Sequence, residues 1–211
     1  MALTVKKFSQ GMTTQQYIDQ IKVNKQAFLD IYHSLEIPAE DLAFFDGLAR
    51  RLRLAVFTAD WCGDALSTTP TILRLAESTD KLEVRVFNRD EELELTNSFL
   101  PEHRASTVPV FVVFEPPLRE VARFIETARA LVPQIDAMDE AIAQEAAAPD
   151  LGRGSADPRA VARGKRTAFR VSHAIEWGRV IIREFRQVVA EGLVLPPQER
   201  PAEGGTQWPP V

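Results

Sequence analysis

A single cysteine is the residue of this sequence whose type and surroundings are best suited to chemistry. Cys62 lies in the segment Trp61-Cys62-Gly63-Asp64-Ala65, and the chain holds no second cysteine. The apolar run at residues 54–57 has the length of a strand, and an amphipathic helical pattern begins at Leu66. A thiol at this junction lies in the first turn of the helix, where unpaired backbone N–H groups and the helix dipole favour an anion. The setting therefore favours a nucleophilic thiolate with a lowered pKa.

The neighbours of Cys62 modify this expectation. Asp64 lies two residues after Cys62, and its charge disfavours the thiolate and raises the thiol pKa relative to a neutral neighbour. We interpret Asp64 as an acid that stabilises the first turn of the helix, with a proton relay as the alternative. Trp61 either shields the sulfur and contacts a partner or packs as an ordinary aromatic residue.

The order of the motifs resembles the thioredoxin family over roughly residues 50–145. The features shared with that family are Phe57, Trp61-Cys62-Gly63, Pro70 within the helix, and Thr107-Val108-Pro109 before an apolar strand at 110–114. In the family the motif is Trp-Cys-Gly-x-Cys, and a cis-proline loop faces the cysteine pair. The resemblance implies that Cys62 is the attacking cysteine. It also implies that Thr107, Val108 and Pro109 form a wall that pairs with an extended peptide substrate if the Val108–Pro109 bond is cis.

Three positions depart from the family pattern. Ala65 stands where the family has its resolving cysteine, Val56 where it has a buried carboxylate, and Val86 where it has a lysine. The usual dithiol cycle is therefore excluded, and Trp-Cys-Gly-Asp-Ala is similar to a monothiol branch of bacterial thioredoxin-like proteins. A second thiol from glutathione, another small thiol or a protein must then resolve any mixed disulfide.

The order of predicted elements fits a central mixed sheet flanked by helices, and the resemblance implies an α/β, thioredoxin-like three-layer fold, here with an N-terminal helical extension and a C-terminal helix. After the motif strand and helix come strands near 82–87, 110–114 and 118–125, with helices near 91–100 and 126–142. Before the motif, residues 13–35 predict one long helix and residues 42–52 a second, with no strand ahead of them.

The chain divides into four predicted parts. Residues 1–145 form the thioredoxin-like domain with its N-terminal helices, 146–168 a linker, 169–192 an amphipathic C-terminal helix, and 193–211 a Pro-rich tail that is extended or disordered. The helix at 169–192 needs a partner for its apolar stripe, which is either its own domain or a second copy in a homodimer. The basic residues from Arg159 to Arg170 are predicted to be a solvated linker and helix start, with contact to an acidic surface or a phosphate as the alternative.

Composition sets broad limits on function. The chain is 45% hydrophobic and 26% charged with a net charge of −5, so nothing favours nucleic acid as a partner. It has no signal-peptide pattern and no apolar run of about 18 residues, so a cytoplasmic protein without membrane contact is expected. We expect no metal and no organic cofactor, because the histidines lie far apart and there is one cysteine.

Two functions follow from these residues. The first is thiol–disulfide exchange through Cys62 with an external resolving thiol, with Trp61, Gly63 and Asp64 as modulators. The second is a non-catalytic binding module that uses the thioredoxin groove or the C-terminal helix. The partner is a protein or a small thiol or disulfide in the first case and a protein in the second.

Overall fold

The sheet lies at the centre of the structure, a computed structural model that describes residues 2–147 and 157–206. Its strands are β1 (Leu52–Thr58), β2 (Leu82–Asn88), β3 (Val110–Glu115), β4 (Arg119–Ile125) and β5 (Ala202–Gly205). The order across the sheet is β2-β1-β3-β4-β5. The pairs β1–β2 and β4–β5 are parallel, and β1–β3 and β3–β4 are antiparallel. The predicted mixed sheet is therefore confirmed.

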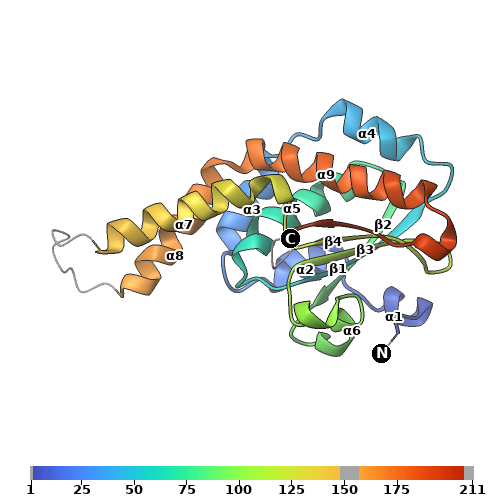
Figure 1. Cartoon of the computed structure of the whole chain (residues 1–211), viewed down its shortest axis with the longest axis horizontal. Coiled ribbons are helices and arrows are strands. Elements are labelled where there is room, and N and C mark those ends of the chain that lie inside the picture. Colours follow the sequence, from blue (N-terminus) through green and yellow to red (C-terminus); the bar gives the residue numbers. More distant parts are fainter. Residues whose placement is uncertain (1, 148–156, 207–211) are drawn as a thin grey trace.

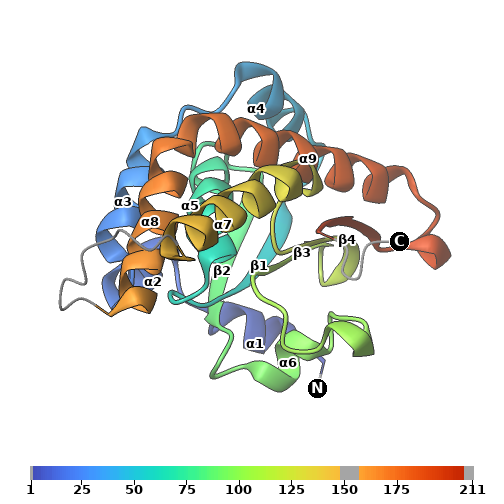
Figure 2. The same ribbon diagram turned by 60° about the vertical axis from the view of Figure 1, so that its left-hand side comes forward.

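Helices cover both faces of the sheet. They are α1 (Val5–Ser9), α2 (Thr14–Gln20), α3 (Lys25–Ser34), α4 (Ala39–Asp46), α5 (Gly63–Glu77), α6 (Leu93–Asn97), α7 (Val132–Ala147), α8 (Pro158–Ser172) and α9 (Ala174–Val194). Helices α1 and α6 lie on one side, and α5 and α9 lie on the other with α3 and α4 beyond them (Figures 1 and 2). This is the predicted three-layer fold.

Strand β1 joins the two cores because successive side chains point to opposite faces of a sheet. Leu54 and Val56 belong to the larger cluster, which includes α5 and α9, while Ala55 and Phe57 belong to the smaller one under α1 and α6. All four are fully buried. The strand therefore ends at Thr58 in a fixed position, four residues before Cys62.

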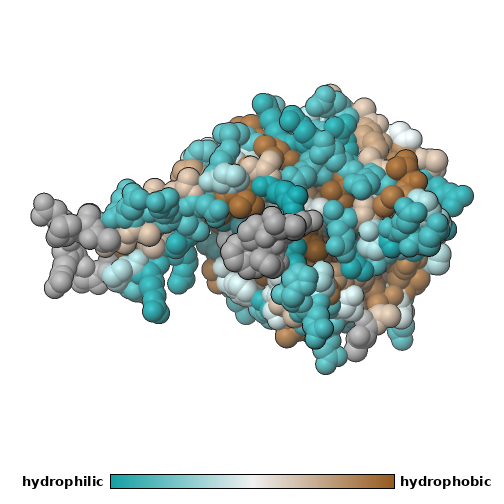
Figure 3. All heavy atoms as spheres, viewed as in Figure 1, coloured by the Kyte–Doolittle hydropathy of each residue, from teal (hydrophilic) through white to brown (hydrophobic). Residues whose placement is uncertain are grey.

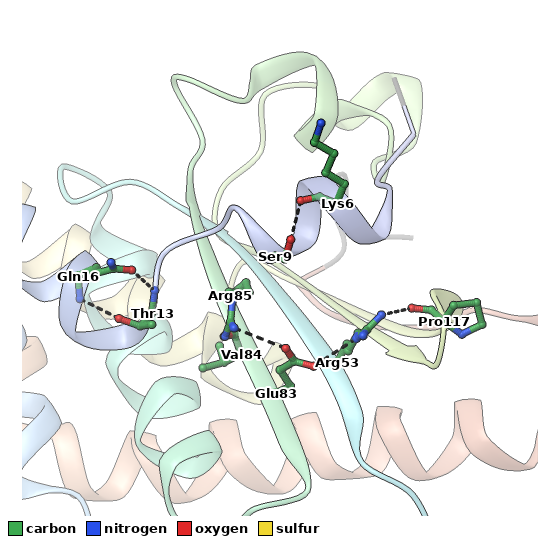
Figure 4. Close-up of polar contacts among 9 residues, drawn as sticks. All are labelled: Lys6, Ser9, Thr13, Gln16, Arg53, Glu83, Val84, Arg85 and Pro117. Carbon is green, nitrogen blue, oxygen red and sulfur yellow. Dashed lines mark hydrogen bonds and ion pairs between the residues drawn. The ribbon is translucent and has the colours of Figure 1, made fainter.

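The N-terminal extension is helical, but its predicted long first helix is wrong. It is interrupted between α2 and α3, where Asn24 adopts a left-handed conformation with φ 61°. Thr13 and Gln16 form the predicted capping box at the start of α2 (Figure 4). In the described residues before β1 there is no strand, only a single bridge between Met12 and Val86.

Ion pairs at the edge of the sheet are drawn in Figure 4. Glu83 on β2 lies between Arg53 and Arg85, with N···O distances of 3.2 and 3.5 Å. Arg53 also donates to the backbone oxygen of Pro117 at 2.6 Å, which ties β1 to the turn between β3 and β4. These side chains are about a quarter exposed, so each pair contributes only about 1 kcal/mol or less.

The C-terminal part differs from its prediction in three ways. The single helix predicted over 169–192 is wrong, since α8 ends and α9 begins on either side of His173. Helix α8 begins at Pro158, inside the stretch predicted as a linker, and residues 148–156 lie outside the described residues. Residues 202–205 form β5 along the edge of β4, so the predicted tail is ordered there, while 207–211 lie outside the description. Helix α9 reaches this edge because Gly192 has no side chain: a Cβ there would lie 2.1 Å from the Val121 oxygen.

The apolar stripe of α9 packs on its own domain. Trp177, Ile181, Ile182, Phe185 and Val189 are buried in the larger core cluster. Of the two partners considered for this stripe, the chain's own domain is the one observed. A homodimer through residues 169–192 stays a prediction.

We expect Phe185→Ala to lower the free energy of unfolding by about 3–5 kcal/mol. Phe185 is 1% exposed, and its ring centroid lies 6.2 Å from that of Phe45 and 5.8 Å from that of Phe124. Urea unfolding would measure the loss. Val194→Ala is the matched control, since Val194 lies on the same helix and is 83% exposed, and it should change stability by less than about 0.5 kcal/mol. Equal effects of the two substitutions would contradict the assigned core.

Candidate functional site

Cys62 and the cis-proline loop meet at the start of α5. Cys62 is the N-cap residue of this helix and is partly buried. Its Sγ donates a hydrogen bond to the backbone oxygen of Val108 at 3.4 Å, and the Val108–Pro109 bond is cis. Thr107 precedes them, partly buried, and its N–H donates to the Arg104 oxygen at 3.1 Å. The structure thus brings Cys62 against the predicted proline wall.

The surroundings of Cys62 disfavour its thiolate form. Burial raises its pKa above the ordinary value, and the nearby charge of Asp64 raises it further. The backbone N–H groups of Ala65 and Asp64 and the charge of Arg170 lower it, as expected at a helix start, but they do not offset burial. The lowered pKa expected from the helix position is therefore wrong in direction.

We expect the alkylation rate of Cys62 by iodoacetamide to rise with pH at a midpoint above that of the unfolded chain. Only the thiolate reacts, and the folded protein disfavours it. By linkage, the stability that comes from keeping this thiol neutral is complete below the unfolded-state pKa. It is lost as pH rises through the folded-state pKa. Alkylation in buffer and in urea, followed by mass spectrometry, would measure both midpoints. A folded midpoint below the unfolded one would contradict the burial argument.

Trp61 lies at the surface beside Cys62. It is 51% exposed, so the alternative in which it packs as an ordinary buried aromatic is not observed. Its Nε1 donates to Asp90 at 2.8 Å, and the guanidinium of Arg89 lies over its ring at 5.0 Å. These contacts hold the ring in one place while leaving half of it open to a partner.

Asp64 is paired with a residue from the far end of the chain. Its carboxylate accepts from Nη2 of Arg170 at 3.0 Å, and Nη1 of Arg170 donates to Oγ of Ser67 at 3.0 Å. Arg170 is 5% exposed and its guanidinium lies 5.6 Å from the centre of the Trp177 ring. Asp64 does lie in the first turn of α5, as predicted. The prediction that Arg170 belongs to a solvated stretch is wrong.

A signal for Arg170 was present in the sequence. At helical spacing, position 170 shares a face with Ala174, Trp177, Ile181 and Phe185, and all four are buried. A charged residue on an apolar face needs a partner of opposite charge. That requirement points to an acid elsewhere in the fold.

Glu126 is a second carboxyl group near the site. Burial raises its pKa; the charge of Arg104 opposes this rise, and the charge of Asp64 adds to it. Its N–H donates to the Pro109 oxygen at 2.7 Å, and its Oε2 lies 2.9 Å from Nη2 of Arg104, which is itself buried. The sequence predicts that Glu126 begins the last helix of the domain, and this prediction is wrong. Glu126 instead follows β4 with φ 65°, and α7 begins at Val132.

The N-terminal helices also contact the site. Asp60 accepts from the N–H groups of Lys22 and Val23 at 2.8 and 3.0 Å, which fixes the loop before Cys62. Burial raises the pKa of Tyr17 to about 12; a hydrogen bond with Thr58 opposes the rise, and the charges of Asp60 and Cys62 add to it. A cavity of about 440 Å³ lies here, lined in part by Tyr17, Asp60 and Asp90.

Neither a metal site nor a membrane span is visible in the described ranges. Within residues 2–147 and 157–206, no three His, Cys, Asp or Glu side chains are grouped to hold a metal ion. No helix in those ranges has the length and apolar character to cross a bilayer.

Comparison with known proteins agrees with the fold. A crystal structure of PA1234, a protein of unknown function from Pseudomonas aeruginosa, is 17% identical with a TM-score of 0.56, covering 86% of this chain and 98% of that one. An HIV epitope-scaffold is 16% identical with a TM-score of 0.57, covering 88% and 95%. These similarities show the fold alone, and curated protein sequences give no match. A thioredoxin family model matches residues 11–139, more than half of the chain, and the chain therefore belongs to the thioredoxin family.

Proposed function

We propose that this protein carries out monothiol thiol–disulfide exchange with Cys62 as the nucleophile. The observation that carries the proposal is the contact between Cys62 and the cis-proline loop, with Sγ 3.4 Å from the Val108 oxygen. An extended peptide that pairs with the backbone of this loop would present its disulfide to that sulfur. Trp61 and Gly63, both exposed beside Cys62, leave the approach open.

The reaction has two balanced steps. The Cys62 thiolate attacks one sulfur of a substrate disulfide, a bond forms between the two sulfurs, and the other substrate sulfur leaves as a thiolate. An external thiolate then attacks the substrate sulfur of this mixed disulfide and releases Cys62. The second step needs an external thiol because Ala65, 3% exposed, stands at the position of a resolving cysteine. The sum of the two steps leaves one substrate sulfur as a free thiol and the other in a disulfide with the external thiol; a second external thiol must cleave that disulfide to reduce the substrate completely.

A binding module is the second candidate, and the raised pKa of Cys62 favours it. The positions where the family resemblance places a carboxylate and a lysine hold Val56 and Val86, which are fully buried and cannot transfer a proton. In this function the backbone of the loop at Pro109 would pair with an extended peptide without covalent chemistry. Exchange and binding differ in their need for the sulfur.

A disulfide-bonded reporter peptide distinguishes the two functions. Reduced protein is mixed with excess peptide that carries glutathione on its single cysteine. Without added thiol, exchange predicts at most one reaction per chain; with millimolar glutathione it predicts repeated turnover. Peptide binding that is unchanged by alkylating Cys62, together with no turnover above that of glutathione alone, would support the binding module.

A further inference from the structure

The C-terminal extension contributes a buried cation to the site. Helices α7 and α8 form a hairpin that projects from the domain, and the side of it seen in Figure 3 is mainly hydrophilic (Figures 1 and 3). The last turn of α8 lies against α5 instead, and there Arg170 is 5% exposed. An arginine is rarely buried to this extent without a specific partner.

The guanidinium of Arg170 lies close to Gly63, the residue after Cys62. A Cβ added to Gly63 would lie 3.4 Å from Nη2 and 3.5 Å from Nε of Arg170. The same Nη2 is 3.0 Å from Asp64, and Nη1 is 3.0 Å from Ser67. The buried Nε has no hydrogen-bond partner in the part of the chain that the structure describes. The charge is thus desolvated, and the carboxylate of Asp64 is the acid with which it forms an ion pair.

We propose that Arg170 is a positioning residue for the Cys62 reaction: its ion pair neutralises Asp64 at the start of α5 and so weakens the repulsion that a thiolate at Cys62 would meet. The inference rests on the exchange function proposed above. An unpaired Asp64 carboxylate two residues from the sulfur would repel a second negative charge. Because α8 supplies the cation, the C-terminal extension completes the site. The charged and titratable groups that act on this region are Tyr17, Asp60, Asp64, Arg104, Glu126 and Arg170.

Arg170→Met tests the inference because it keeps the length of the side chain and removes its charge. We expect the pH midpoint of Cys62 alkylation to rise by roughly one unit. Exchange near neutral pH should fall about tenfold, while the plateau at high pH stays the same. Arg170→Lys should restore much of the loss. A residue needed only for folding would lower the plateau and leave the midpoint in place.

Other variants keep the test decisive. Arg166→Met is the matched control, since Arg166 lies one turn earlier on α8, is 43% exposed and pairs with Asp139 at 2.6 Å; it should leave the midpoint unchanged. Asp64→Asn should lower the midpoint, because Arg170 then faces the thiol unneutralised. If Arg170→Met does not fold, Arg170→Gln takes its place, because glutamine also lacks the charge but keeps a hydrogen-bond donor for Ser67, and an unchanged midpoint in that variant overturns the inference.

The outcomes separate this inference from the proposed function. Normal exchange with a midpoint that Arg170→Met does not move overturns the role of Arg170 and leaves the exchange function standing. If Arg170→Met raises the alkylation midpoint but the wild-type protein shows no exchange, the proposed function is overturned. The control of the Cys62 thiol by Arg170 is then still supported.

Discussion

Replacing Cys62 by serine is expected to abolish mixed-disulfide formation and thiol-dependent turnover completely. The chain holds no other cysteine, and a serine hydroxyl without an adjacent base does not attack a disulfide. The fold should be retained, because the new hydroxyl can still donate to the Val108 oxygen that accepts from Sγ. We expect a change in unfolding free energy within about 1 kcal/mol. Mass spectrometry of the peptide adduct and urea unfolding measure the two effects.

The stability measurement is the control for this substitution. A Cys62→Ser protein that folds normally and forms no adduct assigns the chemistry to the sulfur. Turnover that survives the substitution would mean that the added glutathione reacts by itself, and the exchange function would have to be abandoned. Peptide binding that survives while turnover is lost is the result expected if the cis-proline loop pairs with the peptide independently of the sulfur.

Replacing Ala65 by cysteine is expected to remove the need for an external thiol in the release step. Position 65 lies three residues after Cys62 in the first turn of α5 and is 3% exposed. A resolving thiol held there acts at an effective concentration of millimolar or more. Release at micromolar external thiol should therefore rise by about 10²- to 10⁴-fold. The release rate at several glutathione concentrations measures this effect.

The oxidised form of Ala65→Cys should contain an intramolecular disulfide, visible as a mass lower by two hydrogens. The larger side chain costs roughly 1–3 kcal/mol of stability because the site is already packed. Ala65→Ser adds a group of similar size without a thiol and is the matched control. A release rate that stays dependent on external thiol in Ala65→Cys would show that the sulfurs are not arranged as the fold implies.

The sequence was sufficient for the parts of the fold that depend on local pattern. Hydrophobic periodicity and the positions of proline predict strand β1, the helix after Cys62 and the apolar strand after Pro109. The contact between Cys62 and Val108 joins residues 46 positions apart. It was predicted only through the family resemblance, since spacing alone does not place two loops together.

The features missed from the sequence depend on long-range packing. Arg170 and Asp64 are 106 positions apart, and each is an ordinary charged residue until the fold pairs them. The sequence predicts the effect of the helix start on the pKa of Cys62 but not the burial that opposes it, because burial depends on the packed fold. The short β5 is rich in glycine and has weak strand propensity. It forms because β4 offers an open edge with which it pairs and because α9 packs against it.

The most direct test of the account compares Cys62 with the same cysteine in the unfolded chain. The rate constant for attack on the glutathionylated peptide is measured for each form and divided by its thiolate fraction at the same pH. The account predicts a higher value per thiolate for the folded protein, because the cis-proline loop holds the peptide against the sulfur. An equal or lower rate constant per thiolate would contradict the proposed function, since the cis-proline loop would then not speed the reaction beyond that of a cysteine in an unfolded chain.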